Sequence, residues 1–301
     1  MIIVIVGPTG VGKTRVSIEL AKRLNTEIIS GDSVQVYKGL TIGSAKVTEE
    51  EKEGIKHHMI DILNPQESFS VALYQRYVRE AIKTIESQGK IPIIVGGTGF
   101  YIKSTLHDFN FDQAHRDAHF DVKFESYSNE ELHDLLKRRD EKASKLVHPN
   151  NRHRVLQSLF RAEQGVKRSE QSNQEKPLYD YRIIGLTMPK EKLYERINQR
   201  VEMMFHQGLV EEVKHLYDAN IHTQATQAIG YKELYQYFNQ EVSLEEAKEA
   251  IKKHSRQYAK RQYTYFKNQF NVKWFNVDLS AFNNTIDTVI EYTLNEIHKG
   301  D

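Results

Sequence analysis

The chain has 301 residues, of which 39% are hydrophobic, and its 42 basic residues nearly balance its 41 acidic ones. This balance gives no indication of a nucleic-acid partner, so only a local basic patch could provide one. The absence of cysteine excludes a disulfide framework, a cysteine zinc site and a cysteine nucleophile. The sequence has no apolar run of the roughly 20 residues that a bilayer requires, and its start lacks the features of a signal peptide. We therefore expect a cytoplasmic protein with no membrane contact.

The first third of the chain alternates apolar strands with amphipathic helices. A continuous β-branched run opens it and is followed by a glycine-rich turn, which predicts a buried parallel strand leading into a helix. Gly96-Gly97-Thr98-Gly99 is expected to open another helix. This alternation predicts an α/β fold with a doubly wound parallel sheet. The strands are expected at residues 2–6, 27–30 and 91–95, and the helices from the turn to about residue 24 and at 71–86.

The pattern changes near Phe109. Residues 110–178 are polar, with charge-rich helices, no convincing buried strand and a polar loop at 168–176. Ser128-x-x-Glu131 resembles a capping box at the start of one helix. We expect a P-loop core made of residues 1–109 and 179–301, and a mainly helical insertion at 110–178.

The last third returns to the core. Residues 182–187 predict a strand, residues 272–277 a closing strand, and Ser243-x-x-Glu246 the start of a long helix that ends near residue 269. Another long helix is expected after residue 187, and we interpret its apolar stripe as core packing. The stripe consists of Leu193, Ile197, Val201, Met204, Phe205 and Leu209.

The most specific motif follows the first strand. Gly7-Pro8-Thr9-Gly10-Val11-Gly12-Lys13-Thr14 fits the pattern G-x-x-x-x-G-K-[ST] between a strand and a helix. Its glycines let backbone N–H groups surround phosphate oxygens, and the helix N-terminus adds its positive dipole end. Lys13 supplies a full charge, and the Thr14 hydroxyl can hold Mg²⁺. The motif predicts a phosphate site of the kind found in many ATP-binding and other nucleotide-binding families.

A single acidic residue is well placed for catalysis. An energy-coupling ATPase normally carries an aspartate after a second buried strand, but the strand at 91–95 ends in Gly96-Gly97. Asp32 instead follows the strand at 27–30, and strand C-termini converge on one crevice in this fold. This position suits a base that deprotonates an incoming acceptor. Gly31-Asp32-Ser33 could equally be a turn or a helix N-cap, and the spacing leaves both interpretations open.

Several segments, taken together, resemble the tRNA dimethylallyltransferase family. Their order and spacing agree over nearly the whole chain. The segments are Gly7 to Thr14, Ile29 to Tyr37, His57 to Asp61, Gly96 to Tyr101, His148 to Asn151, Gln227 to Glu233 and Tyr258 to Gln262.

The resemblance implies transfer of a dimethylallyl group from its diphosphate to the N6 amine of an adenosine in tRNA, just 3′ of the anticodon. Diphosphate leaves, Mg²⁺ is the cofactor, and the partners are the anticodon stem-loop and dimethylallyl diphosphate. We expect a monomer. By the family's pattern Asp32 is the general base, Thr98 and Lys13 assist catalysis, and Arg200 or Arg196 reaches the diphosphate. The residues expected to contact RNA are Asp32, Ser33, Val34, Gln35, Thr98, His153, Arg154, Gln157, Lys260 and Arg261.

The sequence also departs from the family in the insertion. The family usually has two arginines three residues apart after the His148 segment, and here Arg154 matches the first whereas Gln157 stands at the second. Arg152 or Arg161 could compensate. The stretch at 110–145 is also short for the family.

Residues 252–267 carry a basic stripe without any acid. From the residues alone a solvated helix face with tyrosines in the core is favoured, whereas the resemblance favours phosphate contact and base stacking on RNA. The basic residues are Lys252, Lys253, Arg256, Lys260, Arg261 and Lys267, and the interleaved tyrosines are Tyr258, Tyr263 and Tyr265.

Three functional alternatives remain distinguishable by experiment. The chain could transfer the prenyl group, it could be a P-loop kinase of a small metabolite with Asp32 as base, or it could be a nucleotide-dependent RNA-binding module without chemistry. His57-His58 suggests a metal site, but adjacent side chains point apart and no third ligand is evident. We expect a structural or substrate-positioning role for these histidines.

Overall fold

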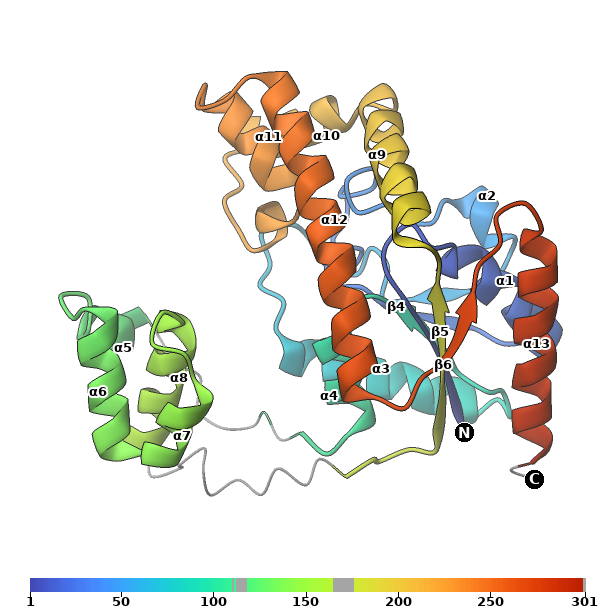
Figure 1. The fold of residues 1–301 in the computed structure, drawn as a ribbon, viewed down its shortest axis with the longest axis horizontal. Helices are drawn as coiled ribbons and strands as arrows, with labels where there is room; N and C mark the ends of the chain where they lie inside the picture. The colour runs from blue at the N-terminus through green and yellow to red at the C-terminus, as the bar shows by residue number, and fades with distance from the viewer. Residues whose placement is uncertain (110, 112–117, 165–175, 300–301) are drawn as a thin grey trace. The chain divides into compact units, whose positions relative to one another are not determined.

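The protein was analysed as a computed structural model that describes residues 1–109, 111, 118–164 and 176–299. It consists of two compact units, one formed by Met1–His107 and Pro177–Asp301, the other by Asp108–Lys176. The larger unit contains a six-stranded sheet, and the smaller unit is helical (Figure 1). Where the chain enters and leaves the smaller unit, the N–H of Asp108 donates to the carbonyl of Lys176 at 3.0 Å.

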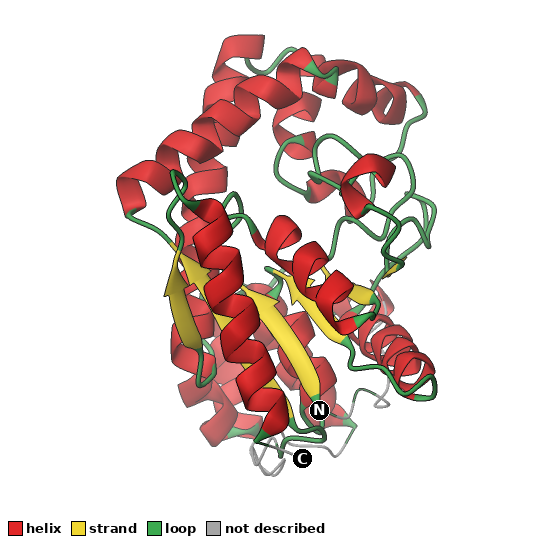
Figure 2. Cartoon of the chain, turned by 90° about the vertical axis from the view of Figure 1, so that its right-hand side faces the viewer, coloured by secondary structure: helices red, strands yellow, loops and turns green. Residues whose placement is uncertain are grey.

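All strand pairs in the sheet are parallel, in the order β3-β2-β4-β1-β5-β6, with helices on both faces (Figure 2). This confirms the predicted doubly wound α/β fold with a P-loop. The strands are β1 (Ile2–Val6), β2 (Ile28–Gly31), β3 (His57–His58), β4 (Ile93–Gly96), β5 (Tyr181–Thr187) and β6 (Lys273–Asn276).

The central strand β1 is buried along its whole length and divides the core into two hydrophobic clusters. Successive side chains of a strand point to opposite faces. Accordingly Ile2, Val4 and Val6 belong to one cluster, and Ile3 and Ile5 to the other. A strand covered by helices on both sides needs apolar residues at every position, and this is why the opening run of the sequence has no polar alternation.

The helices of the larger unit confirm most of the predicted boundaries. Two long helices begin as expected, and the side chains of Ser70 and Ser243 cap them by accepting hydrogen bonds from the N–H groups of Leu73 and Glu246. These helices are α1 (Lys13–Leu24), α2 (Glu49–Lys52), α3 (Val71–Glu86), α4 (Gly99–Leu106), α9 (Lys190–His206), α10 (Leu209–Asp218), the 3₁₀ turn η1 (Ala225–Gln227), α11 (Tyr231–Phe238), α12 (Leu244–Gln269) and α13 (Phe282–His298).

The prediction of a single long helix after β5 is wrong. The helix is interrupted at Gly208, whose φ of 99° lies in the left-handed region that favours glycine, and α10 starts at the next residue. The apolar stripe therefore serves two helices, with Val201 buried in α9 and Leu209 in α10. Met204 and Phe205 are only half-buried, although both pack against the core.

The smaller unit has its own hydrophobic core. Ser128 caps α6 in a complete capping box with Glu131, as predicted. Most of the expected polar loop at 168–176 lies outside the described residues. The helices are α5 (Ala118–Val122), α6 (Asn129–Arg139), α7 (Glu141–Leu146) and α8 (Arg152–Glu163).

Strand β3 is the shortest in the sheet, and its two histidines have structural partners. His58 Nε2 lies 2.6 Å from Glu27 Oε2, and His57 Nδ1 lies 2.8 Å from the carbonyl of Ile55. Lys56 and Lys90 also pair with Glu27, each at 3.2 Å. None of the helices in the described part of the chain is long and apolar enough to cross a bilayer.

Candidate active site

The site lies at the carboxyl ends of β1, β2 and β4, which are neighbours in the sheet. The P-loop follows β1, Asp32 follows β2, and the Gly97-Thr98-Gly99 turn follows β4. Parallel strands end at the same edge, so segments far apart in the sequence meet there. The backbone joins two of them directly, because the N–H of Thr98 donates to the carbonyl of Gly31 at 3.2 Å.

The P-loop ends at Gly12, the N-cap of α1, whose φ of 104° is left-handed. The first N–H groups of an α-helix have no intrahelical partners, and such groups bind anions well. Lys13 Nζ donates to the carbonyls of Gly7 and Pro8, at 2.9 Å each. Burial and the charge of Arg200 lower the pKa of Lys13 to about 7, whereas Asp32 acts in the opposite direction.

Both candidate arginines of α9 reach the P-loop. Arg196 Nε donates to the carbonyl of Gly10 at 2.9 Å, and a guanidinium nitrogen of Arg200 donates to the Thr9 hydroxyl at 3.4 Å. Burial lowers the pKa of Arg200, and the charge of Arg196 adds to the effect. Arg196 is thus held by the loop backbone, whereas Arg200 shares its electrostatic surroundings with Lys13. This arrangement favours Arg200 for the diphosphate.

Thr14 is the residue that could hold Mg²⁺. It occupies the first turn of α1, it is exposed, and no hydrogen bond within the described part of the chain uses its hydroxyl. In the same part of the chain, no three histidine, cysteine, aspartate or glutamate side chains gather into a metal site. Mg²⁺ commonly binds through one or two protein oxygens, water and substrate phosphates. A single hydroxyl beside a phosphate loop fits that mode.

Asp32 has the geometry of a turn residue and keeps one carboxylate oxygen unbonded to the described residues. Its Oδ1 accepts hydrogen bonds from the N–H groups of Val34 at 2.8 Å and Gln35 at 3.3 Å, the geometry of a turn or cap residue. Burial raises the pKa of the Asp32 carboxyl, and the two N–H groups and the charges of Lys13 and Lys46 lower it. No hydrogen bond from a described residue uses Oδ2, so that oxygen is available to a substrate proton.

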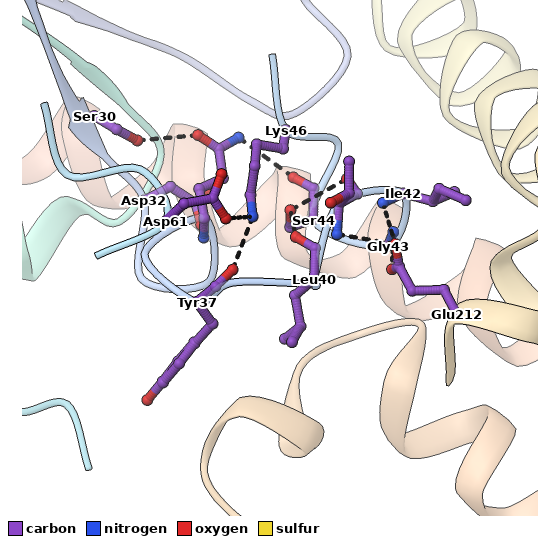
Figure 3. A network of polar contacts seen from close by, with 12 residues as sticks. Ser30, Asp32, Tyr37, Leu40, Ile42, Gly43, Ser44, Lys46, Asp61 and Glu212 are labelled. Atoms are coloured by element: carbon purple, nitrogen blue, oxygen red, sulfur yellow. Dashed lines mark hydrogen bonds and ion pairs between the residues drawn. The ribbon is translucent and has the colours of Figure 1, made fainter. Parts of the chain in front are cut away.

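The Gln35 side chain makes hydrogen bonds within the protein. Its Oε1 accepts from the Ser30 hydroxyl at 3.0 Å, and its Nε2 donates to the carbonyls of Ser44 and Ala45, at 3.3 Å each (Figure 3). The amide is therefore occupied in fixing the loop that follows β2. Ser33 and Val34 are half-buried beside it.

Thr98 remains well suited to a substrate contact. Its hydroxyl is buried and has no hydrogen-bond partner among the described residues, although the nearby Tyr258 hydroxyl interacts with it electrostatically. A buried hydroxyl without a partner is destabilising unless a ligand or water satisfies it. The turn that carries Thr98 packs tightly against α12, since a side chain at Gly97 would collide with Gln262. Gln262 Oε1 in turn accepts from the N–H of Thr9 at 2.8 Å.

Tyrosines from four helices surround Asp32 closely enough to sense its charge. Burial and this charge raise the pKa of Tyr258 to about 12. Tyr74, Tyr101 and Tyr231 are affected in the same direction, with burial as the main cause. All four side chains therefore stay protonated at neutral pH, and Asp32 is the acidic group among them.

The basic residues of α12 fall into two groups. Committed residues pair with other side chains of the protein, and open residues are exposed. Lys252 pairs with Glu202 and Glu249, and Arg256 donates to Asn198 at 2.6 Å. Lys260 and Arg261 are exposed and line a surface groove of about 550 Å³. The remaining lining residues are polar or aromatic: Gln257, Thr264, Tyr265, Asn268 and Gln269.

The tyrosines on α12 are mostly packed against the protein. Tyr263 contacts Trp274 with ring centroids 4.9 Å apart, and Tyr265 packs against Gly99. Tyr263 is thus occupied by Trp274, whereas Lys260 and Arg261 are exposed cations of α12.

In the insertion, the candidate contacts lie on α8. His153 and Arg154 are exposed, and Gln157 is half-buried. Arg152 binds the carbonyl of Tyr127 at 2.7 Å and that of Phe124, so it fastens the helical unit internally. Of the two arginines that could compensate for Gln157, Arg152 is thus committed to the fold.

Sequence reasoning missed Lys46 and Glu212. Lys46 is buried beside Asp32, and the Glu212 carboxylate accepts from the N–H groups of Thr41, Ile42 and Gly43 at 2.9, 2.7 and 3.0 Å (Figure 3). Both residues lie in stretches where charged side chains are common, and no spacing distinguishes them. Gly43 is a glycine at a position where a side chain would collide with the Tyr231 ring at 2.6 Å, but this contact is visible only in the structure.

Comparison with known proteins gives a consistent result. The profile described as IPP transferase matches residues 35–269. The tRNA dimethylallyltransferase of Anoxybacillus flavithermus is 50% identical over 300 residues, which is 98% of this chain and 94% of the relative. That of Bacillus licheniformis is 51% identical and covers 92% of this chain and 90% of its own.

Solved structures agree with these relatives. The tRNA delta(2)-isopentenylpyrophosphate transferase of Staphylococcus epidermidis is 44% identical, with a TM-score of 0.74 over 100% of this chain and 99% of its own. A eukaryotic dimethylallyltransferase acting on tRNA is 30% identical, with a TM-score of 0.86 over 99% of this chain and 79% of its own. This chain belongs to the IPP transferase family.

Proposed function

We propose that this protein transfers a dimethylallyl group from dimethylallyl diphosphate to the N6 amine of the adenosine 3′ of the anticodon in tRNA, with release of diphosphate. The observation that carries the chemistry is the position of Asp32. A half-buried carboxylate with one oxygen unbonded to the described residues lies at the same sheet edge as a phosphate-binding loop and the unsatisfied hydroxyl of Thr98. Family membership supplies the substrate class.

The reaction requires a base because an exocyclic adenine amine is a poor nucleophile, its lone pair being delocalised into the ring. We propose that Asp32 Oδ2 accepts the proton as the amine attacks the allylic carbon. Oδ1 stays bonded to the N–H groups of Val34 and Gln35, which holds the carboxylate in place. The new N–C bond replaces the C–O bond, and the bonding electrons leave with the diphosphate.

The leaving group is assigned to the P-loop. The charges of Lys13 and Arg200 are close enough to interact, and both can neutralise charge that develops on the diphosphate. Mg²⁺, held by the Thr14 hydroxyl and the phosphate oxygens, would supply further neutralisation when bound. Binding would require Lys13 to exchange the carbonyls of Gly7 and Pro8 for phosphate oxygens.

RNA is assigned to exposed polar side chains. An adenosine within a stacked loop cannot reach the sheet edge, so the target base must be flipped out of the stack. We propose that Lys260 and Arg261 on α12, and His153 and Arg154 on the insertion, contact tRNA phosphates. The protein is taken to act as a monomer.

The test is a product assay. The protein is incubated with unmodified tRNA, Mg²⁺ and either dimethylallyl diphosphate or ATP, and the nucleosides are analysed by mass. The proposal expects one prenylated adenosine, formed only with the prenyl donor and only with tRNA present. Phosphate transfer from ATP without any need for tRNA would instead establish a small-molecule kinase, and RNA binding without product a binding module.

A further inference from the structure

Among the described residues, Lys46 is the one buried lysine near Asp32 that lies outside the phosphate loop. Its side chain is 3% exposed, and its Nζ donates to the carbonyl of Tyr37 at 2.8 Å and pairs with Asp61 Oδ1 at 2.6 Å (Figure 3). A buried ammonium is tolerated only with such partners, because desolvation opposes its charge. The Asp61 side chain is 47% exposed, so the negative end of the pair faces solvent and the positive end lies inside the protein.

The loop that carries Lys46 is held from both sides. Glu212 binds the N–H groups of residues 41–43, and Gln35 binds the carbonyls of Ser44 and Ala45. Ala45, immediately before Lys46, has a φ of 48°, and Asp61 has a φ of 54°. Left-handed backbone at a non-glycine residue is unfavourable and persists only where surrounding contacts enforce it. The contacts here enforce the position of a single cation.

Gln35 joins the Lys46–Asp61 pair to Asp32: its N–H donates to Asp32 Oδ1 at 3.3 Å, its carbonyl accepts from the N–H of Asp61 at 3.1 Å, and its Nε2 donates to the carbonyl of Ala45, next to Lys46, at 3.3 Å. The titratable groups that interact electrostatically with Asp32 are Lys13 of α1, Lys46 of the loop after β2, Tyr74 of α3, Tyr101 of α4, Tyr231 of α11 and Tyr258 of α12. The tyrosines are neutral, so the two lysines are the cations that act on Asp32. Under the proposed function Lys13 has its charge met by the diphosphate. The charge of Lys46 is not met by the diphosphate, because Lys46 lies outside the phosphate loop and pairs with Asp61.

We propose that Lys46 is a positioning residue for Asp32, whose fixed positive charge keeps the Asp32 carboxylate ionised and able to accept the substrate proton. Asp61 and the carbonyl of Tyr37 hold the ammonium in place. The inference rests on the proposed role of Asp32 as base. It predicts that the proton affinity of Asp32 follows the charge of the Lys46–Asp61 pair.

Two substitutions change that charge in opposite directions. Lys46→Met removes the cation and keeps a stem of similar length, so the pKa of Asp32 should rise by roughly 0.5–1 unit. Asp61→Asn removes the negative partner and keeps its shape, so the pKa of Asp32 should fall. Lys46→Arg keeps the charge and is the matched control. Asp61 is half-exposed, so its variant still tests the idea if Lys46→Met does not fold.

The primary readout is the carboxyl carbon signal of Asp32 in labelled protein, titrated without substrates or Mg²⁺ and assigned with Asp32→Asn. The second is the single-turnover rate of prenyl transfer against pH. The acidic limb should move to higher pH in Lys46→Met and to lower pH in Asp61→Asn. A purely structural role would lower the rate of both variants without moving either midpoint.

Opposite shifts in the two variants support the proposal. Midpoints within about 0.2 unit of the wild type in both, or shifts of the same sign, would overturn it. The carbon titration needs no turnover, so it tests Lys46 even if the wild type makes no prenylated product. In that case the proposed function fails, and the electrostatic coupling is still measured.

Discussion

Two carboxylates lie at opposite ends of the same strand, and their surroundings are opposite as well. Glu27 precedes β2 and is surrounded by His58, Lys56 and Lys90, at 2.6–3.2 Å. Burial alone would raise its pKa, but the hydrogen bonds from these three partners lower it to about 2. Asp32 follows β2, has no such partner, and has its pKa raised by burial.

The difference separates stability from function along one strand. A carboxyl whose pKa is lowered on folding stabilises the protein above its unfolded pKa, and loses that contribution as the pH falls through the folded value. A carboxyl whose pKa is raised stabilises only below its unfolded pKa, and the contribution is lost as the pH rises through the folded one. Glu27 therefore supports the fold at neutral pH, whereas the charge on Asp32 opposes folding and is available for chemistry.

The largest expected effect tests the catalytic end. Asp32→Asn keeps size and the Oδ1 acceptor but loses the proton acceptor, so the chemical step should fall by roughly 10²- to 10⁴-fold. The affinities for both substrates should stay within about tenfold of the wild-type values, because the target adenine and the diphosphate keep their sites. Single-turnover assays with saturating tRNA and dimethylallyl diphosphate isolate this step. Wild-type transfer by the variant would reduce Asp32 to a turn residue like any other.

The next effect concerns the cation that Asp32 shares with the phosphate site. Lys13→Ala should lower transfer by roughly 10²-fold or more, since the variant has no ammonium to neutralise the leaving diphosphate. Its fold should be intact, as judged by an unchanged denaturation midpoint, because Lys13 Nζ bonds only to two loop carbonyls within the described part of the chain. Near-normal turnover in the folded variant would remove the diphosphate from this loop.

The structural end should respond in stability and not in chemistry. Glu27→Gln should lower the free energy of unfolding at pH 7 by about 2 kcal/mol, less than the roughly 3 kcal/mol that the full pKa change implies, because Lys56 is largely exposed. The difference from wild type should be full above about pH 5 and shrink as the pH falls toward 2. Urea denaturation across this range measures it.

Glu19→Gln is the matched control for that substitution. Glu19 pairs with Lys22 on the surface at 3.1 Å, and such pairs contribute little, so its loss should change stability by less than about 0.5 kcal/mol. Equal effects of the two substitutions would remove the special status of Glu27. Prenyl transfer at 25 °C should be unaffected by either.

A smaller effect distinguishes committed cations from open ones. Lys56 and Lys90 are bound to Glu27, whereas Lys260 and Arg261 line the groove on α12. Alanine at Lys260 or Arg261 should reduce the salt slope of tRNA binding by about one for each phosphate that the side chain no longer neutralises. Lys252→Ala is the control, because Lys252 pairs with Glu202 and Glu249. Unchanged slopes at both open positions would return α12 to a solvated face.

The smallest effect sharpens the comparison by its sign. At pH 8 Asp32→Asn should be more stable than the wild type, because a buried charge is replaced by a neutral group that still accepts at Oδ1. The advantage should disappear as the pH falls and the wild-type carboxyl becomes protonated. Urea midpoints at pH 8 and pH 5 are compared. A loss of stability at pH 8 would mean that Asp32 is a net structural contact.

Much of the fold follows from local sequence patterns. The helix at 71–86 and the end of α12 at Gln269 agree with expectation because periodicity and capping residues act within a few positions. The break at Gly208 was missed because the apolar stripe continues across it, and a glycine between two helices resembles one within a helix. Strand β3 was missed because two residues carry no period.

The sequence by itself determined the P-loop, the position of Asp32 after β2 and the resemblance to a family, since each depends on neighbouring residues or on ordered motifs. Only the tertiary structure decided which side chains surround Asp32. Lys46 meets Asp61, Glu212 meets residues 41–43, and Gln262 meets Thr9, 253 positions away. Any of the chain's 41 acidic residues could in principle pair with a given lysine. Strand order brings one of them within reach, because the energy of an ion pair depends on distance and burial, which no local pattern records.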